Sequence, residues 1–276
     1  MQIDASDGMS RNIISDDERI DEINERLRLI QKKNGLVFGT DAYLLSAYVK
    51  GKRNAVAADL GSGTGVAAFL LAVKEKAQTV HAYEIQEAFA TLIERNTALN
   101  GLDGRIVTHH ADVREADAGD IGAECDIVIC NPPYMKTDTG KRNEHDAKYI
   151  ARHEVCGGIW DFCAAAKRLL KYGGSFYCIY RPDRLIDLIC AMRENLLEAK
   201  YMTFVHADRK SEPSLVIVEA RYGGGASLKV TPPLFMYDTA TSDCARALSA
   251  DAQAVYDTCS FEHLKRQQNN KNNQCQ

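Results

Sequence analysis

Apolar runs of strand length alternate with longer amphipathic stretches over most of this 276-residue chain. Such alternation is typical of successive βα units, whose crossover helices make neighbouring strands run parallel. The last two runs are joined only by the polar segment 207–214, which is short enough for an antiparallel hairpin. We therefore expect a Rossmann-like, doubly wound α/β fold, with a seven-stranded mixed sheet and helices on both faces. The expected strands are 55–60, 80–85, 106–111, 125–130, 175–180, 201–206 and 215–221.

Smaller elements are expected ahead of this sheet. Leu27–Gln31 and Leu36–Phe38 flank Lys-Lys-Asn-Gly, a turn sequence typical of a small hairpin. Thr40-Asp41 can cap a helix over Ala42–Lys50. Both chain ends are polar, and the C-terminal one is rich in Asn and Gln. The expected organisation is a disordered lead over 1–15, a hairpin and helix packed on the main domain over 16–54, the main domain over 55–238, and an extension over 239–276 that is partly helical and then disordered.

Composition narrows the class of protein. Apolar residues make up 45% of the chain and charged residues 26%, which are average values for globular proteins. Because no apolar run approaches a membrane span and the N-terminus lacks a signal-peptide pattern, we expect a cytoplasmic protein. The nine cysteines are scattered without CxxC spacing, so we expect reduced thiols and no metal site. With a net charge of −4, any nucleic acid must be held by a local basic face.

A glycine-rich loop, Gly61-Ser62-Gly63-Thr64-Gly65, follows the first core strand and precedes a helix. Glycines at 61, 63 and 65 let the backbone turn sharply and let a cofactor lie against it. Glu84 ends the second strand, where a carboxylate can accept hydrogen bonds from both ribose hydroxyls. The G-x-G-x-G spacing and the preceding Asp59 favour S-adenosylmethionine over a dinucleotide, because a carboxylate attracts a cationic cofactor and repels a pyrophosphate.

Two carboxylates of this region have two interpretations each. Asp59 can face the cationic amino group and sulfonium of the cofactor, and Asp112, at the end of the third strand, can accept a hydrogen bond from its adenine amine. Either carboxylate can instead cap a neighbouring loop, as strand-end aspartates often do.

The tetrapeptide Asn131-Pro132-Pro133-Tyr134 follows the fourth strand directly, at the edge of the sheet where open α/β folds bind ligands. Its prolines fix the backbone, so that the Asn131 amide oxygen and the Pro132 carbonyl can act as two converging acceptors. A planar amino group supplies two matching donors, and Tyr134 offers a face for stacking. The tetrapeptide therefore predicts methylation of a planar amino nitrogen without a general base, although a proline-rich turn that merely ends a strand remains an alternative.

These motifs resemble the amino-group N-methyltransferases of the class I fold. The resemblance narrows to the tRNA(Val) adenine-37 N6-methyltransferase family over 27–238, through LRLIQKKNGLVFGTDAYLL, ADLGSGTG, NPPY, SEPSLVIVEARYGGG and LKVTPPLFMYD. It implies S-adenosylmethionine as cofactor, a tRNA substrate and the adenine beside the anticodon as the target. It also implies that Phe38, Gly39, Thr40 and Asp41 belong to the cofactor pocket. The longer N-terminal lead and the Asn/Gln-rich tail depart from the family pattern.

Cations in three loops are candidates for contact with RNA phosphates. One loop is the polar segment Met135–Arg152, expected to form a flap over the site, and the others are two predicted hairpins. Each cation can instead be an ordinary solvated surface charge, and His109 and His110 are interpreted as histidines without a catalytic role. The candidate residues are Lys32, Lys33, Lys136, Lys141, Arg142, Arg209 and Lys210.

Other functions are compatible with the same tetrapeptide. A protein glutamine N5-methyltransferase would place a side-chain amide against it, but the segment ahead of the first core strand is short for a separate recognition domain. An rRNA guanine-N2 methyltransferase is a second alternative. A non-catalytic RNA-binding module is a third, which the intact glycine loop, Glu84 and tetrapeptide disfavour.

Overall fold

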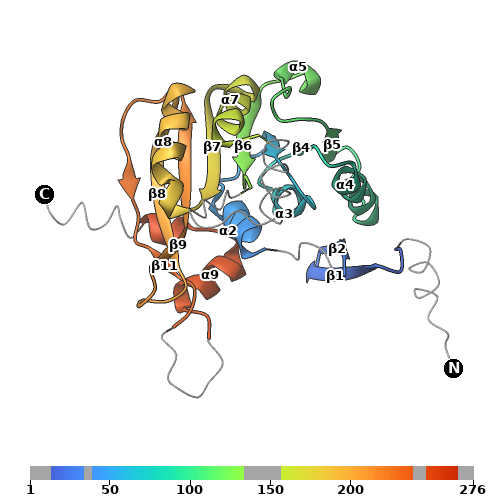
Figure 1. Cartoon of the computed structure of the whole chain (residues 1–276). Coiled ribbons are helices and arrows are strands. Elements are labelled where there is room, and N and C mark those ends of the chain that lie inside the picture. The colour runs from blue at the N-terminus through green and yellow to red at the C-terminus, as the bar shows by residue number, and fades with distance from the viewer. Residues whose placement is uncertain (1–13, 34–38, 134–156, 239–246, 267–276) are drawn as a thin grey trace, which may run out of the picture.

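The computed structural model describes residues 14–33, 39–133, 157–238 and 247–266. Within them a nine-stranded sheet has the order β10-β8-β9-β7-β6-β3-β4-β5, with β11 also paired to β8 (Figure 1). Strands β3, β4, β5, β6 and β7 run parallel, whereas β9 is antiparallel to both β7 and β8. The expected α/β fold with a mixed sheet is confirmed.

All seven expected strands are present. They are β3 Val56–Leu60, β4 Thr79–Glu84, β5 Ile106–His110, β6 Cys125–Cys130, β7 Leu170–Tyr180, β8 Leu197–His206 and β9 Pro213–Tyr222. The sheet has two further strands, β10 Lys229–Val230 and β11 Leu234–Phe235, which the sequence analysis did not predict. Each is two residues long and Pro232-Pro233 separates them, so neither forms a run of strand length.

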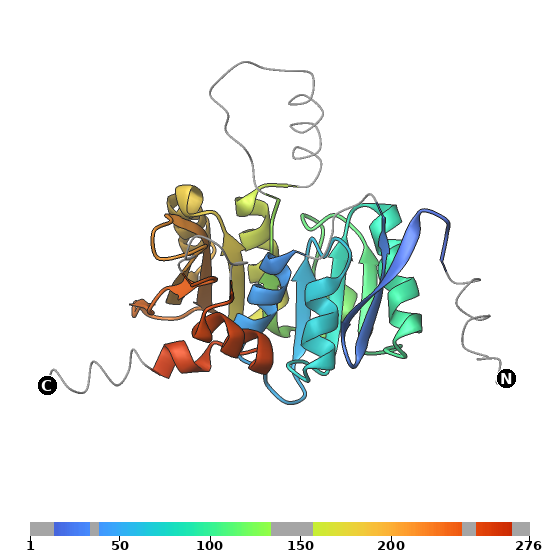
Figure 2. The same cartoon turned by 90° about the horizontal axis from the view of Figure 1, so that it is seen from below.

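Helices cover both faces of the sheet (Figure 2). On one face lie α2 Thr40–Tyr48, α3 Val66–Val73, α4 Glu87–Leu99 and α9 Ala250–Thr258. On the other lie α5 Ala118–Ile121, α7 Ile159–Leu169 and α8 Leu185–Glu194, the last preceded by the 3-10 turn Pro182–Arg184. In β3, Ala57 packs into the first layer, and Ala58 and Leu60 pack into the second. A strand covered on both faces reads as a continuous apolar run, which explains why β3 is evident in the sequence.

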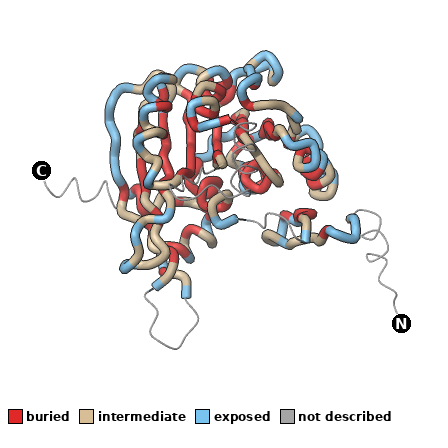
Figure 3. Tube along the Cα trace, in the orientation of Figure 1, coloured by how far each residue is buried: buried red, intermediate tan, exposed pale blue. Residues whose placement is uncertain are grey.

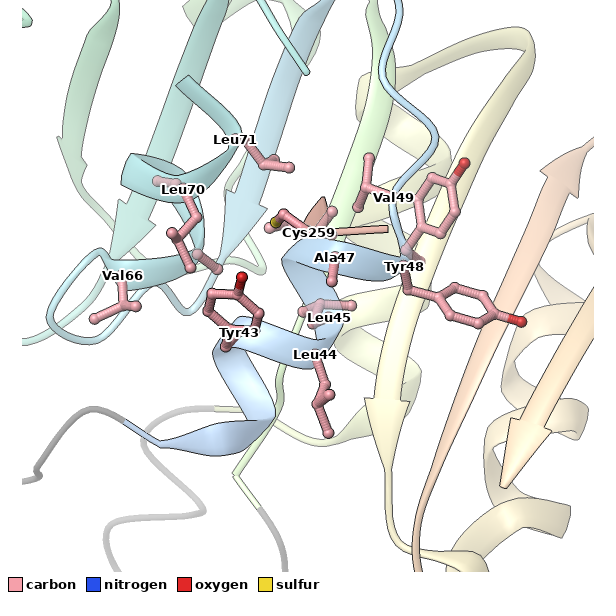
Figure 4. Close-up of a cluster of buried hydrophobic side chains, with 14 of the residues drawn as sticks. Tyr43, Leu44, Leu45, Ala47, Tyr48, Val49, Val66, Leu70, Leu71 and Cys259 are labelled. Carbon is pink, nitrogen blue, oxygen red and sulfur yellow. The ribbon is translucent and has the colours of Figure 1, made fainter. Parts of the chain in front are cut away.

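Helix α2 lies deep in the first layer. Every residue from Tyr43 to Tyr48 is buried. Figure 4 shows α2 beside α3, with Tyr43 near Val66 and with Tyr48 toward the β7 side. A helix that is apolar all round must be enclosed, and the tube in Figure 3 is buried along it and along the central strands. The helix starts at Thr40, with Gly39 at the N-cap, two residues before the expected Ala42.

The N-terminal hairpin differs from the prediction. Leu27–Lys32 (β2) pairs with the preceding strand Glu18–Asn24 (β1). The predicted partner Leu36–Phe38 lies outside the described residues. The partner strand ERIDEIN was missed because charged residues interrupt any alternation of apolar and polar positions.

This hairpin is attached to α4 by specific polar contacts. The Asn96 side chain hydrogen-bonds both the N–H and the C=O of Ile30, and the Arg95 guanidinium forms an ion pair with Glu18 at 2.7 Å. The Arg95 hydrogen bond holds the pKa of Glu18 down at about 2.

Among the helices of the described ranges, none is long and apolar enough to cross a membrane.

Candidate functional site

The register of the parallel strands brings the predicted site residues to one edge of the sheet. Leu60 of β3 pairs with Cys130 of β6 and with Tyr83 of β4, so the next residues of these strands, Asn131, Gly61 and Glu84, come to the same edge of the sheet. Glu84 in turn pairs with His110 of β5, and Asp112 follows two residues later. The order along the carboxyl edge is therefore Asn131, Gly61, Glu84 and Asp112, as a cofactor crevice requires.

The three glycines of the loop have different surroundings. All have positive φ, from +56° to +81°. A Cβ on Gly65 would lie 2.9 Å from side-chain atoms of Ile93 and Phe69, and one on Gly61 would lie 3.1 Å from Phe162. A Cβ on Gly63 would meet no atom within 4 Å. Gly61 and Gly65 thus permit close packing inside the protein. Gly63 leaves open space, in which a cofactor could lie against the loop backbone.

Glu84 holds the glycine loop in place. Its side chain is buried, one carboxylate oxygen accepts a hydrogen bond from the Gly63 N–H at 2.8 Å, and the other accepts one from the Gln86 N–H at 2.8 Å. Each carboxylate oxygen has a second lone pair, so Glu84 retains acceptor capacity for ribose hydroxyls. The predicted ribose ligand therefore also organises the loop that would carry the cofactor.

Asp59 is buried within β3 beside the start of α3. Burial raises the pKa of its carboxyl to about 7, against the lowering effects of the Ser62 side chain and the Ala68 backbone. One of its oxygens, Oδ2, has no hydrogen-bond partner among the described residues. A buried acceptor without a donor is costly, and a cationic group at the loop would supply one. This oxygen fits the amino group of S-adenosylmethionine.

Asp112 makes a local contact in this structure. Its carboxylate accepts a hydrogen bond from the Arg114 N–H at 2.8 Å and forms an ion pair with the Arg114 guanidinium. The Arg114 side chain lowers the pKa of Asp112. The carboxylate therefore caps its own loop, which was the alternative interpretation, and its predicted contact with adenine stays a prediction.

Residues 39–41 lie at the same edge as the glycine loop. The Lys76 ammonium, just after α3, donates hydrogen bonds to three carbonyl groups at the end of α2. Figure 4 shows Tyr43, in the first turn of α2, near Val66, where α3 begins directly after the glycine loop. Gly39, Thr40 and Asp41, at the start of α2, are therefore near the glycine loop, and their contact with the cofactor stays a prediction. Phe38 lies outside the described residues.

The described part of the tetrapeptide, Asn131-Pro132-Pro133, leaves β6 directly beside the crevice. Pro132 is buried and Asn131 half-buried, so the Asn131 amide and the Pro132 carbonyl are partly shielded from solvent. The register of β6 with β7 brings the buried ring of Tyr180 to the same edge, one strand away. Tyr134 lies outside the described residues.

Two aromatic residues of this region were missed by the sequence analysis. Phe162 of α7 packs against Gly61, and Tyr180 ends β7 next to the tetrapeptide. Both belong to ordinary apolar runs, and no local pattern distinguishes them from core residues.

We expect Gly63→Ala to weaken binding of S-adenosylmethionine several-fold, because the new methyl group would occupy the open side of the loop. The matched control is Gly101→Ala, since Gly101 has a similar φ of +61° and equally open surroundings but lies after α4. Each substitution should cost about 1–2 kcal/mol of stability through left-handed backbone strain. Calorimetric titration of both variants checks the prediction, and equal affinities would exclude close approach of the cofactor to Gly63.

The predicted RNA-facing cations are only partly described. Lys32 forms ion pairs with Asp17 and Glu18, and the Lys33 ammonium donates to the Asp16 carbonyl. The Arg209 guanidinium lies over the Phe235 ring, 4.8 Å from its centroid. The Lys210 side chain is exposed. Lys136, Lys141 and Arg142, with the rest of the predicted flap, lie outside the described residues.

The two neighbouring histidines have structural surroundings. His109 stacks on Tyr83 and hydrogen-bonds His81 at 2.9 Å, and burial lowers the pKa of His81 to about 4. His110 contacts the Ile85 carbonyl at 3.1 Å. Within the described ranges, no three His, Cys, Asp or Glu side chains are grouped as a metal ion would require.

Two curated relatives carry the same name, tRNA1(Val) (adenine(37)-N6)-methyltransferase. The relative from Porphyromonas gingivalis is 27% identical over 189 residues, covering 66% of this chain and 73% of its own. The relative from Shewanella sediminis is 25% identical over 185 residues, covering 65% of this chain and 73% of its own.

A solved structure and a family model agree with these relatives. The crystal structure of a predicted O-methyltransferase from Agrobacterium tumefaciens superimposes with a TM-score of 0.64 at 25% identity, covering 80% of this chain and 97% of that one. The model of the methyltransferase small domain matches residues 34–199, which is more than half of the sequence. The match includes the glycine loop, Glu84 and the tetrapeptide, and the chain therefore belongs to the methyltransferase small domain family.

Proposed function

We propose that this protein is a tRNA methyltransferase that transfers a methyl group from S-adenosylmethionine to the exocyclic N6 of an adenine, at position 37 beside the anticodon of tRNA(Val). The observation that carries the proposal is the register of β3 with β6, which pairs Leu60 with Cys130, so that the glycine loop and Asn131 follow at the same carboxyl edge. The acceptor tetrapeptide and the cofactor loop are thus neighbours. The names of the curated relatives support the choice of tRNA and of adenine N6.

The residues of the cofactor crevice fit S-adenosylmethionine. The unpartnered oxygen of Asp59 suits its cationic amino group, Glu84 suits its ribose, and the space over Gly63 admits a close backbone contact. When bound, the cofactor supplies an electrophilic methyl group. Asp112 would reach the adenine amine of the cofactor by exchanging its contact with Arg114.

The tetrapeptide acts on the target nitrogen. The Asn131 amide oxygen and the Pro132 carbonyl would accept the two N–H donors of the adenine amino group. This grip reduces delocalisation of the nitrogen lone pair into the ring and orients that lone pair toward the cofactor side. One N–H proton is released after transfer, so no side chain needs to act as a base before attack. Tyr134 would stack on the flipped adenine and offset part of the unstacking free energy.

RNA contact is assigned to cations on the same edge. Lys210 and Arg209, at the β8–β9 turn, are exposed and lie on the β7 side of Asn131. Lys136, Lys141 and Arg142 follow the tetrapeptide in the sequence. Lys32 and Lys33, on the hairpin at α4, are the weaker candidates because acidic or carbonyl groups already hold them. A substrate of this kind places the enzyme in the cytoplasm.

The test is to incubate the purified protein with labelled S-adenosylmethionine and unmodified total tRNA, and to identify the methylated nucleoside by mass spectrometry. N6-methyladenosine is the expected product, and sequencing of the labelled RNA should locate it at position 37 of tRNA(Val). Label in N2-methylguanosine of added rRNA would favour the guanine alternative. Label only in added protein would favour a glutamine methyltransferase and overturn the proposal.

A further inference from the structure

A second cavity lies at the opposite edge of the sheet from the crevice. It has a volume of about 410 Å³ and is formed by the end of α2, the loop before β3, the end of α3 and the segment after α9. The side chains of Lys50, Lys76, Lys265 and Arg266 line it, with Glu262 as the acidic one. The charged residues that line this cavity are mostly cations, although the whole chain has a net charge of −4.

Lys76 places a positive charge in the wall of this cavity. Its ammonium donates to the carbonyl oxygens of Ser46, Ala47 and Val49 at 2.6, 3.0 and 2.8 Å. These bonds use its three donors and cap the negative end of the α2 dipole. Burial lowers the pKa of Lys76 to about 8. Among the described residues its partners are these carbonyl groups, and no carboxylate forms an ion pair with it. An anion in the cavity would be attracted by this charge without needing a hydrogen bond from it.

Lys265 lies in the wall of the same cavity, where Glu219 balances its charge. Its side chain is buried, and its ammonium forms an ion pair with Glu219 at 2.8 Å and lies 4.1 Å from the centroid of the Tyr48 ring. Lys50 and Arg266 are exposed and stand at the mouth of the cavity. The two exposed cations at the rim, together with Lys76 in the wall, can attract a phosphate group to this cavity.

We propose that this cavity binds a backbone phosphate of the RNA substrate, away from the methylated base. The inference rests on the proposed function. The nine residues of α2 span about 13 Å at 1.5 Å per residue, so the cavity and the crevice edge are separated by a distance that a folded RNA easily bridges. The aromatic rings that line the cavity, Tyr48 and Phe261, are almost completely buried and offer no face on which a nucleobase could stack. A backbone phosphate therefore fits better than a nucleotide.

The experiment compares two double variants that change net charge equally. Lys50→Glu with Arg266→Glu reverses the rim of the cavity. Arg53→Glu with Lys74→Glu reverses two exposed cations nearby that do not line it. Binding of labelled unmodified tRNA is measured by fluorescence anisotropy at several salt concentrations. The rim variant should bind at least tenfold more weakly than the control variant, with the salt slope reduced by about one, the value for one lost phosphate contact.

Further measurements separate the possible failures. Affinity for S-adenosylmethionine should be unchanged in both variants, which shows that they are folded. Equal tRNA binding by the rim and control variants would overturn the inference about the cavity. The proposed function would still stand if the wild type methylates the tRNA. If tRNA binding depends on the rim but the wild type does not methylate the tRNA, the proposed function is wrong and the phosphate site stands. If inorganic phosphate raises the melting temperature in a rim-dependent way but tRNA binding does not depend on the rim, the site serves a free anion and the assignment to RNA is wrong.

Discussion

Asn131→Ala should lower turnover by about a hundredfold or more while leaving the affinity for S-adenosylmethionine nearly unchanged. The reason is that the amide oxygen acts on the target nitrogen, and loss of one preorganised polar contact to a reacting centre typically has this magnitude. Asn131 is the residue that follows β6. It lies near the glycine loop but is not part of that loop. Single-turnover methylation of tRNA and calorimetric titration of the cofactor measure the two quantities separately.

Asn131→Asp is the matched control for this experiment. Aspartate has nearly the same size and keeps acceptor oxygens but has no amide donor. If acceptance of an N–H bond is the role of Asn131, the Asp variant should retain more activity than the Ala variant. Full activity of the Ala variant would show that the tetrapeptide is only a turn at the end of a strand.

Glu84→Ala should weaken binding of S-adenosylmethionine by at least tenfold and up to about a hundredfold, because a hydrogen bond to a charged group contributes about 1.5–3 kcal/mol. Two effects add here. The ribose loses its acceptor, and the N–H groups of Gly63 and Gln86 lose the carboxylate that now fixes the loop. Calorimetry gives the affinity, and thermal unfolding reports the loss of the two internal hydrogen bonds.

Glu84→Gln separates these two effects. The amide keeps one oxygen acceptor for a loop N–H but presents an NH2 group in place of the second oxygen. We expect an affinity between those of the wild type and the Ala variant, with stability closer to the wild type. Unchanged cofactor affinity in both variants would remove Glu84 from the cofactor site.

The parts of this protein that were predictable from sequence are those encoded locally. Strand β3 is apolar except for Asp59, and the tetrapeptide follows directly on β6, which is apolar except for Asp126. Both features lie within a few consecutive residues, so the edge of the sheet that carries Gly61 and Asn131 could be foreseen. The pairing of Asp112 with Arg114, two residues away, is also local, and it was foreseen only as a loop-capping alternative.

The remaining features depend on contacts between distant segments. Strand β1 has charged residues at most positions and is stabilised by Arg95 of α4, which no pattern within β1 indicates. The cation-lined cavity joins Lys50, Lys76 and Lys265, which are brought together only by the packing of α2, α3 and the segment after α9. Such sites are determined by tertiary structure, and periodicity cannot reveal them.

The segment that carries β10 and β11 has a consequence for self-association. Strand β8 is ten residues long, and without a neighbour its outer edge would offer a ladder of free backbone groups to another chain. Residues 229–236 cover that edge through two short parallel pairings, interrupted by Pro232 and Pro233, which have no N–H to offer in turn. Growth of the sheet by addition of a strand from a second molecule at β8 is thereby hindered on this side of the sheet.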